Sequence, residues 1–182
     1  RHGIIHDCLP TPEGIQICRD YHIQMPMQSA FIGWKQEPDD YLEHIMGHDR
    51  LEKLNPIKTF RDNNIVVSFG SDAPCTTPDP IAWMDRAVNN DNAGQAVSVQ
   101  DALRMCTYNG AWAAFDEQER GSLEAGKIAD MAVLSENPYT VPKDKLSGLR
   151  VERLYLGGKP YESCRESILP MMLRGLTSRN KA

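Results

Sequence analysis

Apolar positions in the first two thirds of the chain fall into short runs separated by helical patterns. Runs over residues 3–6, 22–31 and 64–69 predict three strands, the last of which reads "NIVVSF". Nearly continuous apolar strands that alternate with helices are typical of a parallel sheet covered on both faces. We therefore expect three parallel strands in an α/β arrangement.

Capping signals predict the helices between these strands. Thr11 followed by Pro12 predicts a helix to about Tyr21, because threonine caps a helix and proline suits its first position. The pair Asp79-Pro80 predicts another helix in the same way. Further helices are predicted over residues 38–46, from residue 55, and from the capping-box-like Ser98 and Asp101 to about residue 115.

The pattern changes after residue 116. A short strand is predicted over residues 131–134, and "LRVERLYLGGKPYES" predicts a strand, a Gly157-Gly158 turn and a returning strand. These are features of antiparallel β structure. We therefore expect a small β unit over residues 117–162, followed by a solvent-exposed, mildly basic tail over residues 163–182.

Composition limits the classes of partner and compartment. Of 182 residues, 41% are hydrophobic and 25% charged, with a net charge of −5, so neither a nucleic acid nor an anionic membrane is indicated as a partner. No apolar run approaches the ~20 residues of a membrane span. The cysteines form no CxxC pair, which favours reduced thiols in a cytoplasmic protein. They are Cys8, Cys18, Cys75, Cys106 and Cys164.

Polar residues end each predicted parallel strand: His6, Gln28 and Asp72. Parallel α/β folds build their sites at the carboxyl ends of the strands. An imidazole and a carboxylate that converge there could bind a divalent metal such as zinc, and Asp72 could accept a proton from a water. His6 and Asp72 are therefore the candidate metal ligands, and Asp72 is the candidate catalytic residue.

Structural alternatives exist for the same residues. His6 could be a hydrogen-bonded structural histidine, and Asp72 could hold the "GSDAP" loop as an Asx-turn residue. His22 suits the end of a helix, where an imidazole is favoured by the helix dipole. Cys75 lies near Asp72 and could be a nucleophile, although no base is evident beside it. His44 and His48 are interpreted as surface residues.

Three strings point to a family. "GSDAP" follows an apolar strand, "GSLEAGKIADMAVL" follows a helix, and "VERLYLGGKPYE" comes later in the chain. Together with the initial "RHGIIHD" they resemble the C-terminal part of the amidohydrolase superfamily, in the branch that includes N-substituted formamide deformylases. The initial string is similar to the family's "R-H-x-I-E-H-A" strand. The second histidine of that strand is a metal ligand in the family, and it aligns with His6. The aspartate of the family's Ser-Asp pair, which follows the last barrel strand, aligns with Asp72. In the family this aspartate binds metal and transfers protons.

The resemblance implies a fold. Residues 1–116 would be the last three strands of a (β/α)8 barrel, and residues 117–162 part of a small β-sandwich. The family's glutamate before the strand histidine is Ile5 here, and its other metal-binding histidines have no counterpart in the chain. The chain also begins at Arg1 without a methionine, so we expect it to be a portion of a longer protein.

The resemblance also implies a function. The parent protein would hydrolyse an amide-type or cyclic C–N bond of a small molecule with metal-activated water, the metal being zinc or a similar ion. The loops around residues 31–34 and 74–80 would shape the substrate pocket. The chain alone would be inactive, could lack the metal, and would self-associate or pair with the missing N-terminal half. The alternatives are a non-catalytic protein of the same fold and a truncated interaction module.

Overall fold

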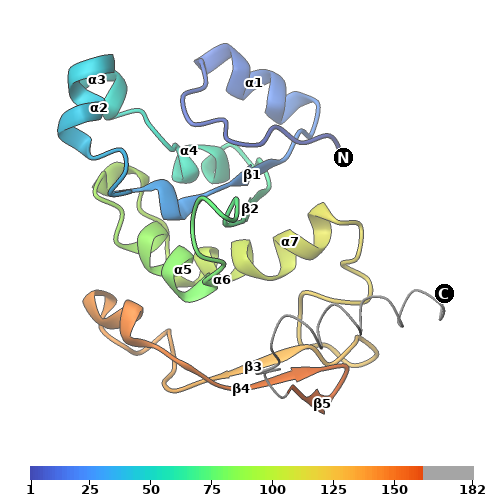
Figure 1. Ribbon diagram of the computed structural model, residues 1–182. Coiled ribbons are helices and arrows are strands. Elements are labelled where there is room, and N and C mark those ends of the chain that lie inside the picture. The colour runs from blue at the N-terminus through green and yellow to red at the C-terminus, as the bar shows by residue number, and fades with distance from the viewer. Residues whose placement is uncertain (162–182) are drawn as a thin grey trace, which may run out of the picture.

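The computed structural model describes residues 1–161, so the predicted tail lies outside the described residues. Two separate sheets form the framework, one parallel and one antiparallel (Figure 1). In the parallel sheet β1 pairs with β2, and in the antiparallel sheet the order is β3-β4-β5. The strands are β1 (Met25–Met27), β2 (Val67–Phe69), β3 (Met131–Leu134), β4 (Val151–Leu156) and β5 (Lys159–Pro160).

Helices surround the parallel strands in the expected alternation, with additional short helical turns. The α-helices are α1 (Pro12–Asp20), α2 (Asp39–Met46), α3 (His48–Leu51), α4 (Ile57–Asp62), α5 (Pro80–Val88), α6 (Val99–Cys106) and α7 (Tyr108–Ala113). The 3-10 helices are η1 (Ser29–Phe31), η2 (Ala93–Gln95) and η3 (Lys143–Gly148). No helix in residues 1–161 combines the length and apolar character that a membrane crossing requires.

The predicted caps are confirmed. Thr11 Oγ1 accepts a hydrogen bond of 3.0 Å from the Gly14 amide and begins α1. Asp79 accepts from the first amides of α5, and Ser98 Oγ accepts from the amide of Asp101 in α6. Each bond satisfies an amide that the first helical turn leaves unpaired. The local sequence therefore fixes where these helices begin.

The first predicted strand, over residues 3–6, is wrong as a full strand. It forms one isolated parallel bridge, Gly3 with Gln24, supported by the Ile4 amide donating to Gln24 O at 3.0 Å. Pro26 is the cause, because it has no amide to continue the ladder toward this segment. The segment therefore lies beside β1 as an extended chain with little regular pairing.

Two other predictions need correction. The strand expected over residues 22–31 is confined to β1, since residues 29–31 form η1. The helix expected over 98–115 breaks at Thr107, whose φ of −124° and ψ of −90° are not helical. Beyond the break, α7 lies against β2, and Asn109 Nδ2 donates to Val67 O at 2.7 Å. A tertiary contact therefore takes the place of helix continuation.

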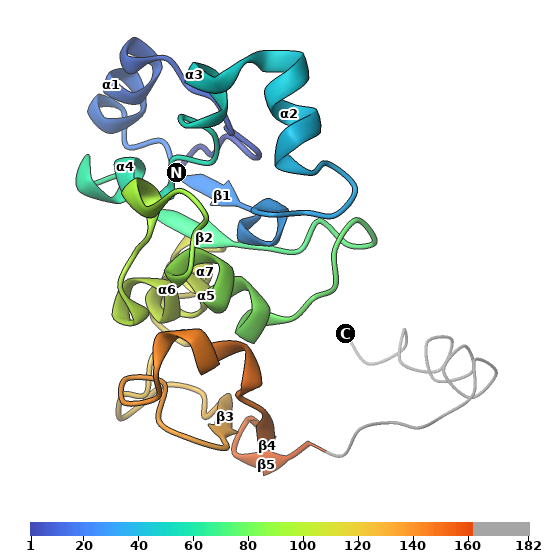
Figure 2. The same ribbon diagram turned by 90° about the vertical axis from the view of Figure 1, so that its left-hand side faces the viewer.

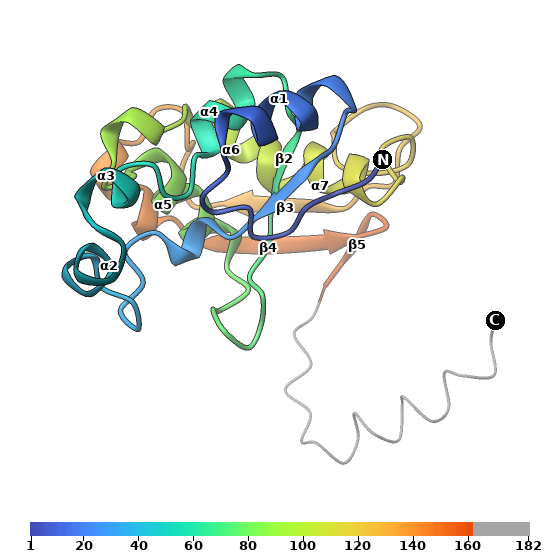
Figure 3. The same ribbon diagram turned by 90° about the horizontal axis from the view of Figure 1, so that it is seen from above.

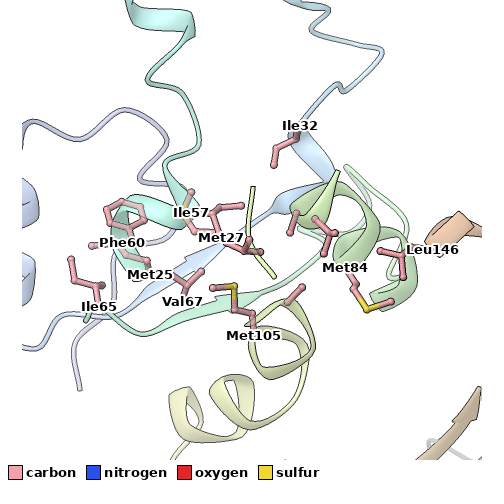
Figure 4. Close-up of a cluster of buried hydrophobic side chains, with 14 of the residues drawn as sticks. Met25, Met27, Ile32, Ile57, Phe60, Ile65, Val67, Met84, Met105 and Leu146 are labelled. Atoms are coloured by element: carbon pink, nitrogen blue, oxygen red, sulfur yellow. The ribbon is translucent and has the colours of Figure 1, made fainter. Parts of the chain in front are cut away.

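The apolar core lies on the face of the parallel sheet that bears Met25, Met27 and Val67. Figure 4 shows these side chains between α4, which contributes Phe60, and α6, which contributes Met105. All are almost fully buried, as a sheet face covered by helices requires. The core therefore fixes β1 and β2 against the helices and positions the ends of both strands.

The β unit has the predicted hairpin. β3 and β4 are antiparallel, and the turn from β4 to β5 contains Gly157 and Gly158 at φ of 58° and 75°. Two successive positive φ values define the turn favoured in tight hairpins. Leu146 of η3 belongs to the predicted β unit, yet it is fully buried in the apolar core to which α5 also contributes (Figures 1 and 4). The division into domains at residue 117 therefore stays a prediction.

Candidate active site

His6 and Asp72 meet at the carboxyl end of the parallel strands. The distance from His6 Nε2 to Asp72 Oδ2 is 3.6 Å, and both side chains are about half exposed. His6 follows the extended first segment, and Asp72 lies in the loop after β2, which projects beyond the strand ends in Figure 3. The predicted proximity of the two side chains is confirmed. Their roles as metal ligands and of Asp72 in catalysis stay predictions.

The backbone turns sharply at both residues. His6 has a φ of 60° and Asp72 a φ of 52°, which place them in the left-handed region. Histidine and aspartate are among the side chains that tolerate this region best. A left-handed residue reverses the chain direction at the strand end. The side chains of His6 and Asp72 therefore lie at the ends of the strands, while the backbone turns away into the following loops.

The loop after β2 is held by Ser71 rather than by the Asp72 carboxylate. Ser71 Oγ accepts from the Ala73 amide at 3.1 Å, and Ser71 O accepts from the Thr76 hydroxyl. The Asp72 contribution to the turn is its backbone carbonyl, which accepts from the Cys75 amide at 2.8 Å. The Asp72 carboxylate faces His6 and the Cys75 thiol and bonds no backbone amide of the loop among the described residues, which argues against the Asx-turn alternative.

An aromatic stack extends from His6. The His6 and Phe31 ring centroids are 5.8 Å apart with an interplanar angle of 11°. Phe31 in turn stacks on Trp34 at 5.0 Å and 22°. Stacked rings restrict the rotamers of their neighbours, so this stack orients the imidazole. The site is therefore continuous from the His6–Asp72 pair to Trp34.

Gln28, the third strand-end candidate, is buried beneath this surface. Its side chain is 6% exposed, and its Oε1 has no hydrogen-bond partner among the described residues. A buried acceptor without a partner is uncommon and costs free energy. A Cβ on Gly70 would lie 3.8 Å from Gln28 Nε2, so the amide lies against the end of β2. Gln28 Oε1 is thus an unpaired acceptor at the strand ends.

An open cavity of ≈ 620 Å³ adjoins the site. Both predicted loops contribute to it, through Trp34 and through residues 73–78. Sequence reasoning missed Ala82 and Arg86, which complete the lining from α5. Their spacing of four residues in a helix that follows the loop was the available signal, since it places both on one helix face. The complete lining is Ala30, Trp34, Gln36, Ala73, Pro74, Cys75, Thr76, Thr77, Pro78, Ala82 and Arg86.

The donor set fits zinc in type but not in number. Imidazole nitrogen and carboxylate oxygen are both common zinc ligands, and a catalytic site takes three protein ligands with an open position. Within residues 1–161, no group of three or more His, Cys, Asp or Glu side chains could hold a metal ion. His6 and Asp72 can therefore supply two ligands, and the remainder of such a site would have to come from elsewhere.

The other titratable candidates lie in ordinary surroundings. His44 and His48 are exposed, as predicted, and His48 lies 3.1 Å from Glu43. His22 follows the end of α1 at a φ of 53°. Cys75 is a free thiol in the cavity wall, and desolvation followed by the Asp72 charge raises its pKa. A raised pKa leaves less thiolate, which argues against Cys75 as a nucleophile.

Curated proteins of similar sequence cover most of this chain. The N-substituted formamide deformylase of Arthrobacter pascens is 33% identical over 152 residues, which cover 80% of this chain and 26% of that protein. The amidohydrolase YtcJ of Bacillus subtilis, whose activity is described as putative, is 27% identical over 124 residues, 63% of this chain and 23% of that protein. The chain thus spans about a quarter of the length of these relatives.

Solved structures show the same fold. A metal-dependent hydrolase from Pyrococcus furiosus superposes with a TM-score of 0.68 at 24% identity, covering 76% of this chain and 29% of that one. An adenosine deaminase from Xanthomonas campestris, solved with bound zinc, gives a TM-score of 0.64 at 18% identity, covering 97% and 41%. The chain corresponds to part of these structures, and the barrel is not closed in it.

The strongest evidence of kinship extends over all the described residues. Residues 1–161 match the amidohydrolase family, and this includes His6, Asp72 and the β unit. The chain therefore belongs to the amidohydrolase family, of which it represents part of the fold.

Proposed function

We propose that the chain is the C-terminal portion of a metal-dependent amidohydrolase that cleaves an amide-type or cyclic C–N bond. The observation that carries this proposal is the His6–Asp72 pair at 3.6 Å, at the carboxyl ends of parallel strands. Membership of the amidohydrolase family supports it. The relative named N-substituted formamide deformylase favours an N-acyl or N-formyl amide as the substrate class.

Each residue of the site has a separate role in the proposed reaction. A bound divalent metal would supply Lewis acidity and activate a water for attack. His6 and Asp72 would hold it, and the Phe31 stack would fix the imidazole. The Asp72 carboxylate would accept a proton as the water attacks and return it to the leaving nitrogen. The loop over residues 73–78 would enclose the substrate.

We infer that the chain alone is incomplete as an enzyme. Two protein ligands hold a zinc ion weakly and leave its position poorly defined. The parallel sheet also has unpaired strand edges, which invite pairing with other strands. The chain would therefore act together with a missing N-terminal half or with a second copy of itself.

Zinc binding tests the proposed ligands without requiring turnover. The purified chain should bind zinc weakly in isothermal titration calorimetry, and His6→Ala and Asp72→Ala should each abolish the specific component. His48→Ala is the matched control, because His48 forms an exposed histidine–carboxylate contact of the same kind on the surface. Binding that His48→Ala removes and the other two variants retain would contradict the proposed site.

Assays for turnover test the second part of the proposal. With added zinc, the chain alone should show no hydrolysis of simple N-acyl and N-formyl amides. Hydrolysis by a monomeric preparation, lost in Asp72→Ala, would show that the chain is a complete enzyme and would refute its proposed incompleteness. Solution mass should be measured on the same preparation.

A further inference from the structure

The cavity beside the site has an unbalanced charge. Arg86 is the single basic residue in its lining, and no carboxylate lines it among the described residues. Arg61 and Arg120, by contrast, are held by carboxylates in ion pairs. Within residues 1–161 Arg86 makes no such pair, although the chain has a net charge of −5. The Asp91 carboxylate lies against the same glycine, Gly33, as the Arg86 guanidinium, but no ion pair joins them among the described residues. The guanidinium of Arg86 therefore has no carboxylate bonded to it.

The position of Arg86 is determined by α5 and by Gly33. Ala82 and Arg86 lie four residues apart on the face of α5 that lines the cavity. A Cβ on Gly33 would lie 2.8 Å from Asp91 Oδ2 and 3.0 Å from Arg86 Nη1, so the carboxylate and the guanidinium both lie against this glycine. Arg86 is in the last turn of α5, where the helix dipole favours a cation. The dipole stabilises the charge but does not occupy its donors.

The remaining lining is apolar and aromatic. Trp34 forms one wall and continues the stack that begins at His6. Pro74, Pro78 and Ala82 add apolar surface, and the threonines of the loop add hydroxyl groups. Ligand sites of this kind combine an apolar lining with a few polar groups that fix orientation. The walls suit a flat, apolar body, and Arg86 suits an anion at one end of it.

We propose that this cavity, the Arg86 cavity, binds the part of the substrate remote from the scissile bond, and that this part is an aryl or bulky apolar group ending in a carboxylate. The inference rests on the proposed function, because that function places the scissile bond at His6 and Asp72. The aromatic stack links the two regions. Arginine binds carboxylates through two parallel hydrogen bonds, which gives direction as well as attraction.

A pair of probes that differ only in the carboxylate tests the inference. 4-(Formamidomethyl)benzoate carries it at the end of the aryl ring remote from the formamide, and N-benzylformamide lacks it. The 182-residue chain is titrated with each in the presence of a metal chelator, with heat or chemical-shift changes as the readout. The wild-type chain should bind the carboxylate probe more tightly, and the preference should fall as salt is raised, because the pair is exposed.

Two variants separate the parts of the cavity. Arg86→Gln should weaken the carboxylate probe roughly three- to tenfold and leave the neutral probe unchanged. Trp34→Ala should weaken both probes alike. Arg104→Gln is the matched control, since Arg104 is an exposed arginine that stacks on Tyr108 and does not line the cavity. Circular dichroism checks that each variant is folded.

Several outcomes would overturn the inference. Equal affinity of the wild-type chain for the two probes, no binding of the carboxylate probe, or an equal loss of both probes in Arg86→Gln would each contradict it. Since the titrations contain no metal, failure of the zinc experiment with intact carboxylate selectivity would refute the proposed function alone. Zinc binding without carboxylate selectivity would refute the Arg86 cavity alone.

Discussion

Arg1 and Glu117 form a contact between residues far apart in the sequence. Arg1 Nη1 donates to Glu117 Oε2 at 2.8 Å, and the same guanidinium lies 4.3 Å from the centre of the Trp112 ring. Glu117 is 9% exposed. Hydrogen bonds from Arg1 lower the pKa of the Glu117 carboxyl to about 2. This ion pair joins the extended first segment to the chain just after α7.

The lowered pKa gives a stability difference that depends on pH. Because the Glu117 pKa falls from 4.5 to about 2 on folding, the ionised carboxylate stabilises the fold fully above about pH 4.5. The contribution declines as the pH falls toward 2. Glu117→Gln should therefore unfold more easily than the wild-type chain at pH 7, and the gap should close below pH 4.5. Urea unfolding across this range measures it.

The control for this prediction is Glu119→Gln, which alters an exposed carboxylate two residues away. It should change the free energy of unfolding little at any pH. If the free energies of unfolding of the wild-type chain and Glu117→Gln differ by the same amount at pH 3 and pH 7, the charge of Glu117 does not contribute to stability. The contact with Arg1 would then stabilise the fold through packing alone.

At the scale of elements, the loop after α7 approaches that helix closely at Gly121. Gly121 has a φ of 85°, and a Cβ there would lie 2.6 Å from the Ala111 Cβ and 3.0 Å from the Tyr108 Cα. Separations this short leave no room for a side chain. The loop after α7 is therefore packed on the helix backbone, which holds α7 against β2.

Two glycine substitutions separate backbone strain from steric overlap. Gly126→Ala should cost about 1–2 kcal/mol, because its φ of 95° disfavours a Cβ while nothing lies within 4 Å. Gly121→Ala should cost this strain plus about 1–3 kcal/mol for the overlap with α7. Thermal or urea unfolding gives both values. Equal losses would mean that the loop can move away from α7 freely.

The hydrogen bond from Asn109 to β2 can be tested in the same way. Asn109→Ala leaves the buried Val67 carbonyl without its partner, which should cost about 1–3 kcal/mol. Asn63→Ala is the control, because Asn63 makes the same type of bond at 2.9 Å to Thr59 O within its own helix. The smaller loss is expected for Asn63. The reverse order would mean that α7 does not depend on β2 for its position.

At the scale of the whole molecule, the parallel sheet has an open edge at β2, and the extended first segment forms its other edge beside β1. On either side of β2, the Gly70 amide donates to Met27 O and the Val66 carbonyl accepts from the Met25 amide, so alternate backbone groups of β2 point away from β1. Asn109 covers one of these, the Val67 carbonyl. On the opposite edge, Ile5 is 60% exposed. Figures 1 and 2 show β1 and β2, the strands of this sheet, side by side.

Open edges predict association in solution. The chain should show a mass above that of a monomer at high concentration in light scattering or sedimentation. Ile5→Lys should lower the association, because a charge on the extended segment at the outer side of the sheet opposes pairing with another chain. Ile17→Lys, which adds the same charge on the exposed face of α1, should not. A monomer at every concentration would contradict the prediction, as would equal effects of the two variants.

Local signals made part of this molecule predictable. Thr11 and Asp79 cap helices through bonds within a few residues, and His6 and Asp72 come at or just after the ends of apolar runs, so their sequence context locates them. The break at Thr107 depends on contacts with a distant strand and loop, and no local pattern carries that information. The exposure of the guanidinium of Arg86 to the cavity also depends on the fold. Metal and catalytic roles rest on ligands beyond these residues.

The left-handed backbone at His6 and Asp72 restricts what evolution can place there. Glycine, asparagine, aspartate and histidine populate this conformation readily, whereas branched apolar residues rarely do. A descendant of this protein freed from selection for chemistry would still be under selection for folding. Such a lineage should accumulate asparagine or glycine at the two positions before valine or isoleucine. The loss of a catalytic group would then leave a recognisable trace, a turn residue where a reactive one had been.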